Sequence, residues 1–73
     1  MRYNLRIGNS RYTNKTLAGC IDIIAARYTE INTECITPAA WILAEIVTMR
    51  DDVQRITYHG QNGKVFVSIN KGE

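Results

Sequence analysis

Apolar and polar residues alternate at the start of the chain. Tyr3, Leu5 and Ile7 share one side of the alternation in residues 2–8, and polar residues occupy the other side. A period of two is typical of a half-buried β-strand, so we predict a first strand here. Gly8-Asn9-Ser10 then turns the chain. Residues 11–13 could return as a short second strand of a local hairpin, but we do not include them among the three strands of the predicted sheet.

The apolar positions that follow have the spacing of a helix. Thr13 and Asn14 are good N-cap residues for a helix that ends near Tyr28. Its core stripe consists of Leu17, Cys20, Ile21, Ile24, Ala25 and Tyr28. Residues 29–36 are polar and β-branched, and we expect them to link this helix to a second one.

Thr37-Pro38 marks the start of the second helix, with Thr37 as the cap and proline at the first helical position. We expect this helix to end at about Arg50 or Asp52. The residues predicted for its buried face are Ala39, Ile42, Leu43, Ile46, Met49 and Val53.

The period of two returns from Gln54 onward. Asn62-Gly63 is a strong hairpin signal, because both residues tolerate the positive φ of a type I′ turn. A two-residue loop would produce four cross-strand pairs: His59 with Phe66, Tyr58 with Val67, Thr57 with Ser68, and Ile56 with Ile69. A loop over residues 60–63 would keep the same faces with shifted partners, whereas a slip of one residue would expose the apolar side chains.

The last strand is the most apolar of the three, since it contains Val65, Val67 and Ile69. We therefore place it in the centre, antiparallel to both neighbours. The 73 residues then form a single small α+β domain over residues 1–73. Its predicted fold is a three-stranded antiparallel sheet in the order 1-3-2 with two helices on one face, in the succession β-α-α-β-β.

Charge is sorted along the chain. The net charge is +4 in residues 1–15, −4 in residues 16–52 and +2 in residues 53–73, and +2 overall. Because strands are expected at both ends and helices between them, this distribution predicts a basic sheet face and an acidic helical face.

Composition sets further limits. The chain is 45% hydrophobic and 22% charged and has no low-complexity run, which is typical of a folded domain. The longest apolar run, residues 39–44, is too short to span a bilayer, and the first residues show no export signal. We therefore expect a cytoplasmic protein with no membrane contact, in which Cys20 and Cys35 are reduced thiols rather than a disulfide.

Few residues could support catalysis. His59 is the only histidine, and Cys20 lies on a core stripe, so its thiol should be protonated. The cysteines, the histidine and the scattered carboxylates lack the spacing of a zinc site, and no glycine-rich loop between a strand and a helix could hold a phosphate. We predict that the protein is not an enzyme and that it uses no metal or cofactor.

The outward side of the predicted sheet is the first candidate binding surface. It is basic, free of acids and carries one exposed aromatic ring. The candidate contact residues are Arg2, Arg6, Arg55, His59, Lys64 and Phe66. Three occupants remain open: a single-stranded nucleic acid with a base on Phe66, an acidic protein surface, or solvent alone. The modest net charge and the lack of a second aromatic weigh against nucleic acid.

Trp41 is the second candidate contact. It falls among polar residues of its helix, and Ile23 falls beside Gly19 outside the core stripe of the first helix. Trp41 could pack across Gly19 and Ile23 within one molecule, because glycine allows a close approach. It could instead anchor a protein interface, such as a homodimer contact.

The sequence therefore predicts a small non-enzymatic protein-binding inhibitor or accessory factor. Its basic sheet face would dock on an acidic surface of a larger macromolecular assembly. The small size and the lack of catalytic chemistry suit a factor encoded by a phage or another mobile element. A single-stranded nucleic-acid-binding module that uses the same face is the alternative.

Overall fold

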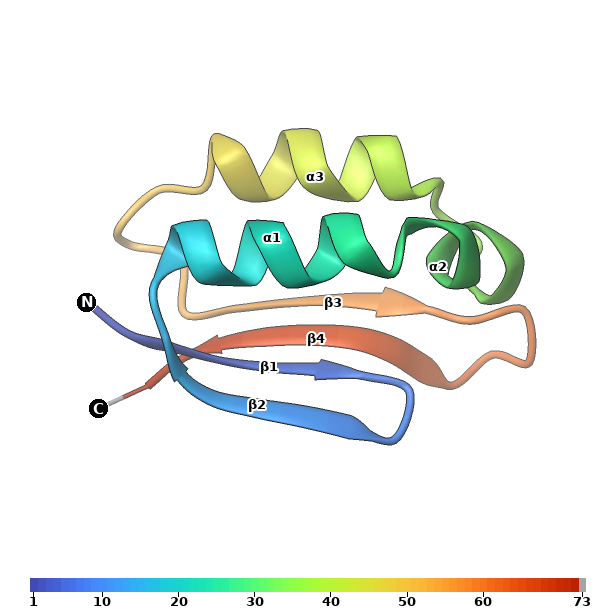
Figure 1. The fold of residues 1–73 in the computed structure, drawn as a ribbon, viewed down its shortest axis with the longest axis horizontal. Helices are drawn as coiled ribbons and strands as arrows, with labels where there is room; N and C mark the ends of the chain where they lie inside the picture. Colours follow the sequence, from blue (N-terminus) through green and yellow to red (C-terminus); the bar gives the residue numbers. More distant parts are fainter. Residues whose placement is uncertain (73) are drawn as a thin grey trace.

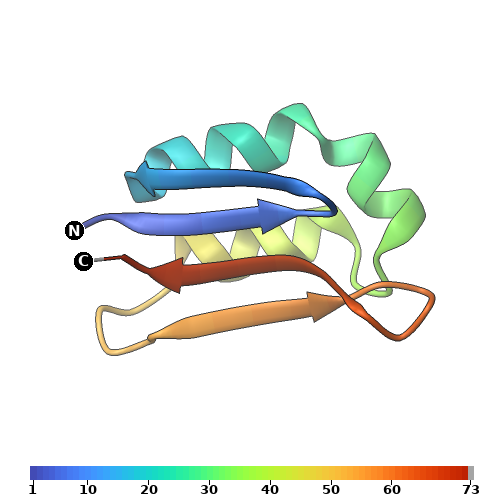
Figure 2. The same ribbon diagram turned by 90° about the horizontal axis from the view of Figure 1, so that it is seen from below.

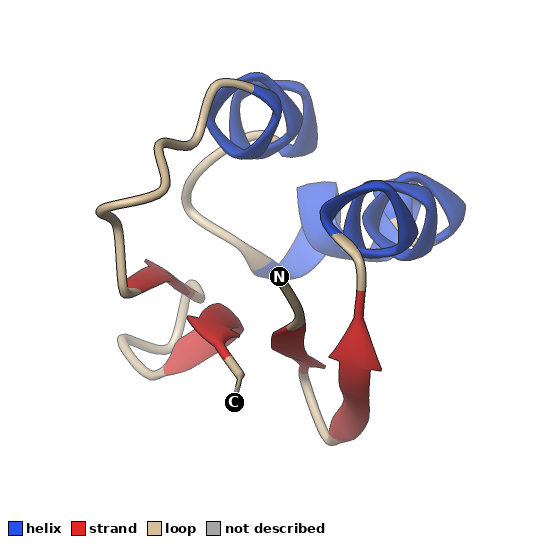
Figure 3. Ribbon diagram, turned by 90° about the vertical axis from the view of Figure 1, so that its left-hand side faces the viewer, coloured by secondary structure: helices blue, strands red, loops and turns tan. Residues whose placement is uncertain are grey.

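One four-stranded antiparallel sheet and three helices make up residues 1–72, the part of the chain that the computed structural model describes (Figure 1). The strands are β1 (Tyr3–Ile7), β2 (Ser10–Lys15), β3 (Arg55–His59) and β4 (Val65–Lys71), and the helices are α1 (Leu17–Ala26), α2 (Tyr28–Glu34) and α3 (Ala39–Val47). The helices lie on the same side of the sheet, so the fold has two layers (Figure 3). The predicted α+β class is confirmed.

The strand order is β2-β1-β4-β3. This order confirms that the last strand lies between the first strand and the Gln54–His59 strand, and that it is antiparallel to both. The prediction of three strands was wrong, because β2 adds a fourth strand outside β1. Figure 2 looks onto the face of the sheet opposite the helices, which we call the open face, and shows the four strands side by side.

The weak alternation of β2 explains why this strand was not counted in the predicted sheet. Tyr12 is the only apolar residue of this strand, and it packs on the core beside its Cα partner Leu5. The register between β1 and β2 shifts near Asn14, which adopts a left-handed φ of 58° and donates its amide hydrogen bond to Asn4 Oδ1 (3.3 Å). A strand with one apolar contact and an irregular end produces almost no periodic signal.

The first helix begins later than predicted. Thr13 and Asn14 belong to β2 and do not cap a helix. The N-cap is Thr16, whose Oγ1 accepts a hydrogen bond from the amide of Gly19 (3.0 Å). Continuation of the strand through Lys15 therefore moved the start of α1 by about one turn.

A break at Arg27 separates α1 from α2 and makes three helices instead of the predicted two. The backbone of Arg27 leaves helical geometry, with φ −111° and ψ 26°. Most of the expected linker, residues 29–36, is helical, and Ile31 in this segment is completely buried. Tyr28 was expected in the core stripe but is 40% exposed, since the chain no longer follows the period of α1.

Asn32 of α2 caps α3. Its Oδ1 accepts a hydrogen bond from the amide of Ala39 (2.8 Å), whereas Thr37 was expected to cap this helix. Pro38 precedes the first helical residue. Asn32, from the preceding helix, therefore accepts the hydrogen bond at the start of α3 that was expected of Thr37.

The third helix is shorter than predicted but buries the predicted face. It ends at Val47, and not at Arg50 or Asp52, because Thr48 is its C-cap and donates its hydroxyl to the Ala44 carbonyl (3.0 Å). The predicted inner residues are all buried or half-buried: Ala39, Ile42, Leu43, Ile46, Met49 and Val53. None of the helices described within residues 1–72 has the length and apolar character needed to cross a membrane.

The β3–β4 hairpin keeps most of the predicted register. Three predicted pairs are present: Ile56 with Ile69, Thr57 with Ser68, and Tyr58 with Val67. At the turn end the prediction was wrong, because a bulge leaves Phe66 as an extra residue and pairs His59 with Val65. Of the two turn residues Asn62 and Gly63, only Gly63 has a positive φ (85°), so the turn is not of type I′.

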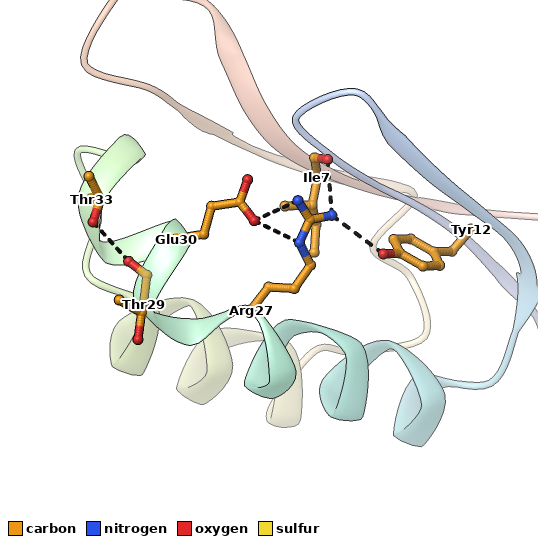
Figure 4. A network of polar contacts seen from close by, with 6 residues as sticks. All are labelled: Ile7, Tyr12, Arg27, Thr29, Glu30 and Thr33. Carbon is orange, nitrogen blue, oxygen red and sulfur yellow. Dashed lines mark hydrogen bonds and ion pairs between the residues drawn. The ribbon is translucent and has the colours of Figure 1, made fainter.

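The core lies between the sheet and the helices, and Arg27 connects the two layers at one end (Figure 4). Its Nη1 donates to the carbonyl of Ile7 and to the hydroxyl of Tyr12, both at 3.4 Å, and its Nε donates to Glu30 Oε1 at 2.8 Å. The completely buried aliphatic residues are Ile7, Ile24, Ile31, Ala39, Ile42, Ile46 and Val67.

Candidate anion-binding groove on the open face of the sheet

Charge separates the two layers of the fold. Every Lys, Arg, Asp or Glu in the four strands is basic, and every such residue in the three helices is acidic. The strands carry Arg6, Arg11, Lys15, Arg55 and Lys71, and the helices carry Asp22, Glu30, Glu34 and Glu45. The sheet layer is therefore positive and the helical layer negative.

Two rows of side chains cross the open face. In the first row Arg11 pairs with Arg6, and Arg6 pairs with Ser68. In the second row Asn70 lies between its two partners, Asn4 on β1 and Arg55 on β3. Because neighbouring Cα partners project to the same face of a sheet, the two rows bring three arginines from three strands onto one surface.

These rows line a groove of about 270 Å³ on the open face, which we call the basic groove. It runs across all four strands. Its lining residues are Asn4, Leu5, Arg6, Arg11, Tyr12, Thr13, Arg55, Ser68 and Asn70. This lining, taken from residues 1–72, contains three arginines and no acid. Arg6, Arg11 and Arg55 form no salt bridge with another residue in that range.

Arg6 is the most enclosed of the three arginines. It is half-buried, and its Nε is buried without a hydrogen-bond partner among the described residues. Its Nη2 donates one long hydrogen bond, of 3.4 Å, to the carbonyl of Val65. A buried guanidinium nitrogen without an acceptor is costly, so the side chain retains unused donor capacity.

Ser68 forms the floor of the groove. It is only 5% exposed although it lies on the open face, and its Oγ accepts a hydrogen bond from Asn70 Nδ2 (3.4 Å). Arg11 and Arg55 are exposed on either side of it. The centre of the face is thus a hollow with polar side chains at its floor and rim rather than a flat solvated surface.

The structure brings only part of the predicted contact residues together. Arg6 and Arg55 line the basic groove. Arg2 is exposed just before β1 and does not line it. His59 and Lys64 are exposed at the hairpin end of the sheet, outside the groove lining.

Phe66 was predicted to be an exposed aromatic, and this was wrong. The residue is half-buried, and its ring lies so close to Gly8 that a Cβ at that position would come within 3.2 Å of Cε1. The bulge in β4 and the hairpin turn after β1 bring these two residues together. The ring therefore packs against the backbone of Gly8 and is not the fully exposed ring that was expected for stacking.

Trp41 lies on α3, in the layer opposite the basic groove, and is 69% exposed. Of the two alternatives for Trp41, packing across Gly19 is wrong, because a Cβ at Gly19 would meet only atoms of Thr16 and Lys15 within 4 Å. Ile23, which seemed misplaced, packs on the core. Trp41 is thus a separate exposed feature of the helical layer.

Sequence reasoning missed Arg11, because it depends on β2 being part of the sheet. The signal that could have found it is the alternation of Arg11, Tyr12 and Thr13 after the Gly8-Asn9 turn. Asn70 was missed because the last strand was identified from its apolar residues Val65, Val67 and Ile69, whereas β4 continues to Lys71. Both Arg11 and Asn70 line the groove together with the predicted residues Arg6 and Arg55.

The chemistry available in this groove is binding. Guanidinium groups bind oxyanions through paired N–H donors, and the neutral Asn, Ser and Thr side chains add further donors. Elsewhere, Cys20 and Cys35 are buried free thiols, and burial raises the pKa of both, which disfavours the reactive thiolate. No group of three or more metal-ligating side chains occurs within the described residues.

Comparisons with known proteins give no further information on the groove. Comparison of the chain with protein-family models, with curated proteins and with solved structures found no match. What the groove binds is therefore inferred from its geometry and its charge.

Proposed function

We propose that this chain is a small non-enzymatic binding protein that docks its basic groove on an acidic surface of a larger protein or protein complex. By docking it would inhibit that assembly or act as its accessory factor. The observation that carries the proposal is the arrangement of Arg6, Arg11 and Arg55, which come from three strands, face one groove and lack acidic partners within residues 1–72. Such positive surfaces steer and orient acidic partners.

An acidic protein fits these features better than single-stranded nucleic acid does. Binders of single strands combine a basic surface with aromatic rings on which successive bases stack. Phe66 is half-buried over Gly8, and Tyr12 packs on the core, so the rings near the groove are occupied within the domain. Arginine forks bind the carboxylates of Asp and Glu without any need for a free aromatic ring.

The helical layer supports a second, separate contact. Trp41 and Val47 are 69% and 59% exposed, and Ala40 and Ala44 are exposed between them on the outer side of α3. A homodimer formed through this surface would leave the basic groove free on the opposite layer. Sedimentation of the wild type and of Trp41→Ala tests it: a dimer lost on substitution supports the contact, and a monomeric wild type contradicts it.

The docking proposal is tested by affinity capture from the host lysate with a matched pair of variants. Arg55→Glu changes a groove residue, and Arg50→Glu makes the same charge change after α3, where the side chain is 82% exposed. We expect the wild type and Arg50→Glu to retain the same protein and Arg55→Glu to lose it. Equal retention by both variants would contradict the proposal.

Nucleic acid is the competing outcome of the same experiment. If nuclease treatment of the lysate abolishes capture, and if a generic single-stranded oligonucleotide binds with an affinity that falls steeply with salt, the partner is nucleic acid. Retention of a protein after nuclease treatment supports the protein-docking proposal.

A further inference from the structure

We propose that the basic groove binds a phosphate monoester, and that the partner presents it as a phosphorylated side chain. This inference rests on the proposed function, because it names the group on the partner surface that the groove recognises. The inference is based on the charge of the groove, the arrangement of its neutral donors, the half-buried Arg6 side chain and the room for a phosphate group.

The charge of the groove favours a doubly charged ligand. Arg6, Arg11 and Arg55 line the same hollow, and the lining drawn from residues 1–72 contains no acid to offset them. One carboxylate carries a single negative charge, whereas a phosphate monoester carries about −1.5 to −2 near neutral pH. A phosphate also offers three acceptor oxygens, so guanidinium groups from different strands can each reach one.

The neutral side chains are already oriented to donate. Asn4 uses its Oδ1 to accept the amide of Asn14 (3.3 Å), which fixes the side-chain amide and leaves Nδ2 for a ligand. Ser68 uses its Oγ to accept from Asn70 (3.4 Å), so its own hydroxyl hydrogen remains available. Both side chains lie in the groove lining between the arginines, and both would complete the hydrogen bonding of an oxyanion.

Arg6 supplies the enclosed part of the site. Its Nε is buried and has no acceptor among the described residues, and its one hydrogen bond to Val65 is long, at 3.4 Å. Because Nε is buried, an anion in the groove would contact the terminal nitrogens of Arg6, Nη1 and Nη2, which make only this one long hydrogen bond within the described residues.

The groove is large enough for a phosphate group and the first atoms of the residue that carries it. Its volume of about 270 Å³ corresponds to about nine water molecules of liquid water. A phosphorylated side chain that projects from a protein surface therefore fits into the groove.

The test is a titration followed by two-dimensional NMR of the isotope-labelled full chain. The probes are inorganic phosphate, a short peptide with one phosphoserine, and the same peptide with glutamate in place of the phosphoserine. We expect saturable shifts of the Asn4, Arg6, Ser68 and Asn70 amide signals with phosphate and with the phosphopeptide. The glutamate peptide should bind at least tenfold more weakly.

Variants identify the groups that bind. Arg11→Thr and Arg55→Thr should each weaken phosphopeptide binding by about tenfold or more, as expected for the loss of a charge-assisted hydrogen bond. Arg50→Thr, on the other layer, should leave the affinity unchanged. Amide spectra with native dispersion confirm that each variant is folded. Equal affinity of all three variants would overturn the assignment of the groove.

Further outcomes separate this inference from the proposed function. If the glutamate peptide binds as well as the phosphopeptide, or if phosphatase treatment of the captured partner leaves its binding intact, the phosphate inference fails while docking through the groove stands. If a phosphodiester strand of thymidylate binds more tightly than the phosphopeptide, the inference fails in favour of nucleic acid. If the phosphopeptide binds but Arg55→Glu still captures the partner, the proposed docking function fails.

Discussion

Arg6 and Arg11 lie directly opposite each other, as Cα partners across β1 and β2 on the open face. Like charges in this position destabilise a sheet, and opposite charges contribute roughly 0.2–1 kcal/mol. We expect Arg11→Glu to raise the free energy of unfolding by about that amount while it abolishes anion binding. Urea unfolding of the wild type and the variant measures the gain.

The control for this substitution is Arg50→Glu, whose side chain is 82% exposed and has no opposed arginine. It makes the same charge change and should stay within about 0.5 kcal/mol of the wild type. Added salt should stabilise the wild type more than Arg11→Glu, because salt screens the repulsion. A loss of stability in Arg11→Glu would show that the two arginines do not repel each other.

Gly8 and Gly63 should respond differently to alanine. Both have positive φ, of 58° and 85°, so each substitution carries the left-handed penalty of about 1–2 kcal/mol. At Gly8 the added methyl would also lie 3.2 Å from the ring of Phe66, whereas at Gly63 nothing lies within 4 Å. Gly8→Ala should therefore lower the unfolding midpoint more than Gly63→Ala. In a Phe66→Leu background this excess should shrink, and an unchanged excess would contradict the contact.

Arg27 should be important for stability although it is not part of the groove. Its guanidinium contacts Glu30, the Ile7 carbonyl and the Tyr12 hydroxyl (Figure 4). Lysine keeps the charge but cannot reach all three acceptors, so Arg27→Lys should cost about 1 kcal/mol. Glu30→Gln should cost less, because the Glu30 side chain is 43% exposed. Chemical denaturation checks both variants, and an equal or larger loss in Glu30→Gln would contradict this order.

Tyr58 should make the fold sensitive to alkali. Its hydroxyl donates a hydrogen bond to Glu45 Oε1 (2.8 Å), and burial together with this carboxylate raises the pKa of Tyr58 well above its ordinary value. The folded state therefore retains the proton after the unfolded chain has lost it, near pH 10. The associated stability is present below that pH and is lost as the pH rises further.

The variant Tyr58→Phe isolates this effect. At pH 7 it should lose about 0.5–1.5 kcal/mol with the hydrogen bond to Glu45. Between pH 9 and about pH 11 its free energy of unfolding should fall less steeply than that of the wild type, since it has no hydroxyl to ionise. If the free energy of unfolding falls equally steeply with pH in both proteins over this range, the alkaline sensitivity does not come from the Tyr58 hydroxyl.

Periodicity in the sequence was enough to predict the parts of the fold with a clear apolar side. Alternation predicted β1, and the match of apolar residues such as Ile56 and Ile69 predicted the register of β3 with β4. The central place of the last strand followed from its high apolar content. These elements are determined by burial, and burial leaves a strong pattern in the sequence.

The missing parts depend on contacts between residues that are distant in the sequence or on single backbone dihedrals. β2 contributes only Tyr12 to the core, so its pairing with β1 left little apolar signal. The cap of α3 comes from Asn32, in another helix. The break at Arg27 and the bulge at Phe66 have no periodic signature. For the same reason the sequence predicted two arginines of the groove and missed Arg11.

The central claim, that the partner contacts the basic groove, is tested most directly by NMR mapping of the isotope-labelled chain with the captured partner. Trp41 is the only tryptophan, so its indole signal reports on the helical layer. We predict that the amide signals of Asn4, Arg6, Arg11 and Ser68 shift or broaden while the indole signal stays in place. A shift of the indole signal with unchanged groove signals would contradict the claim.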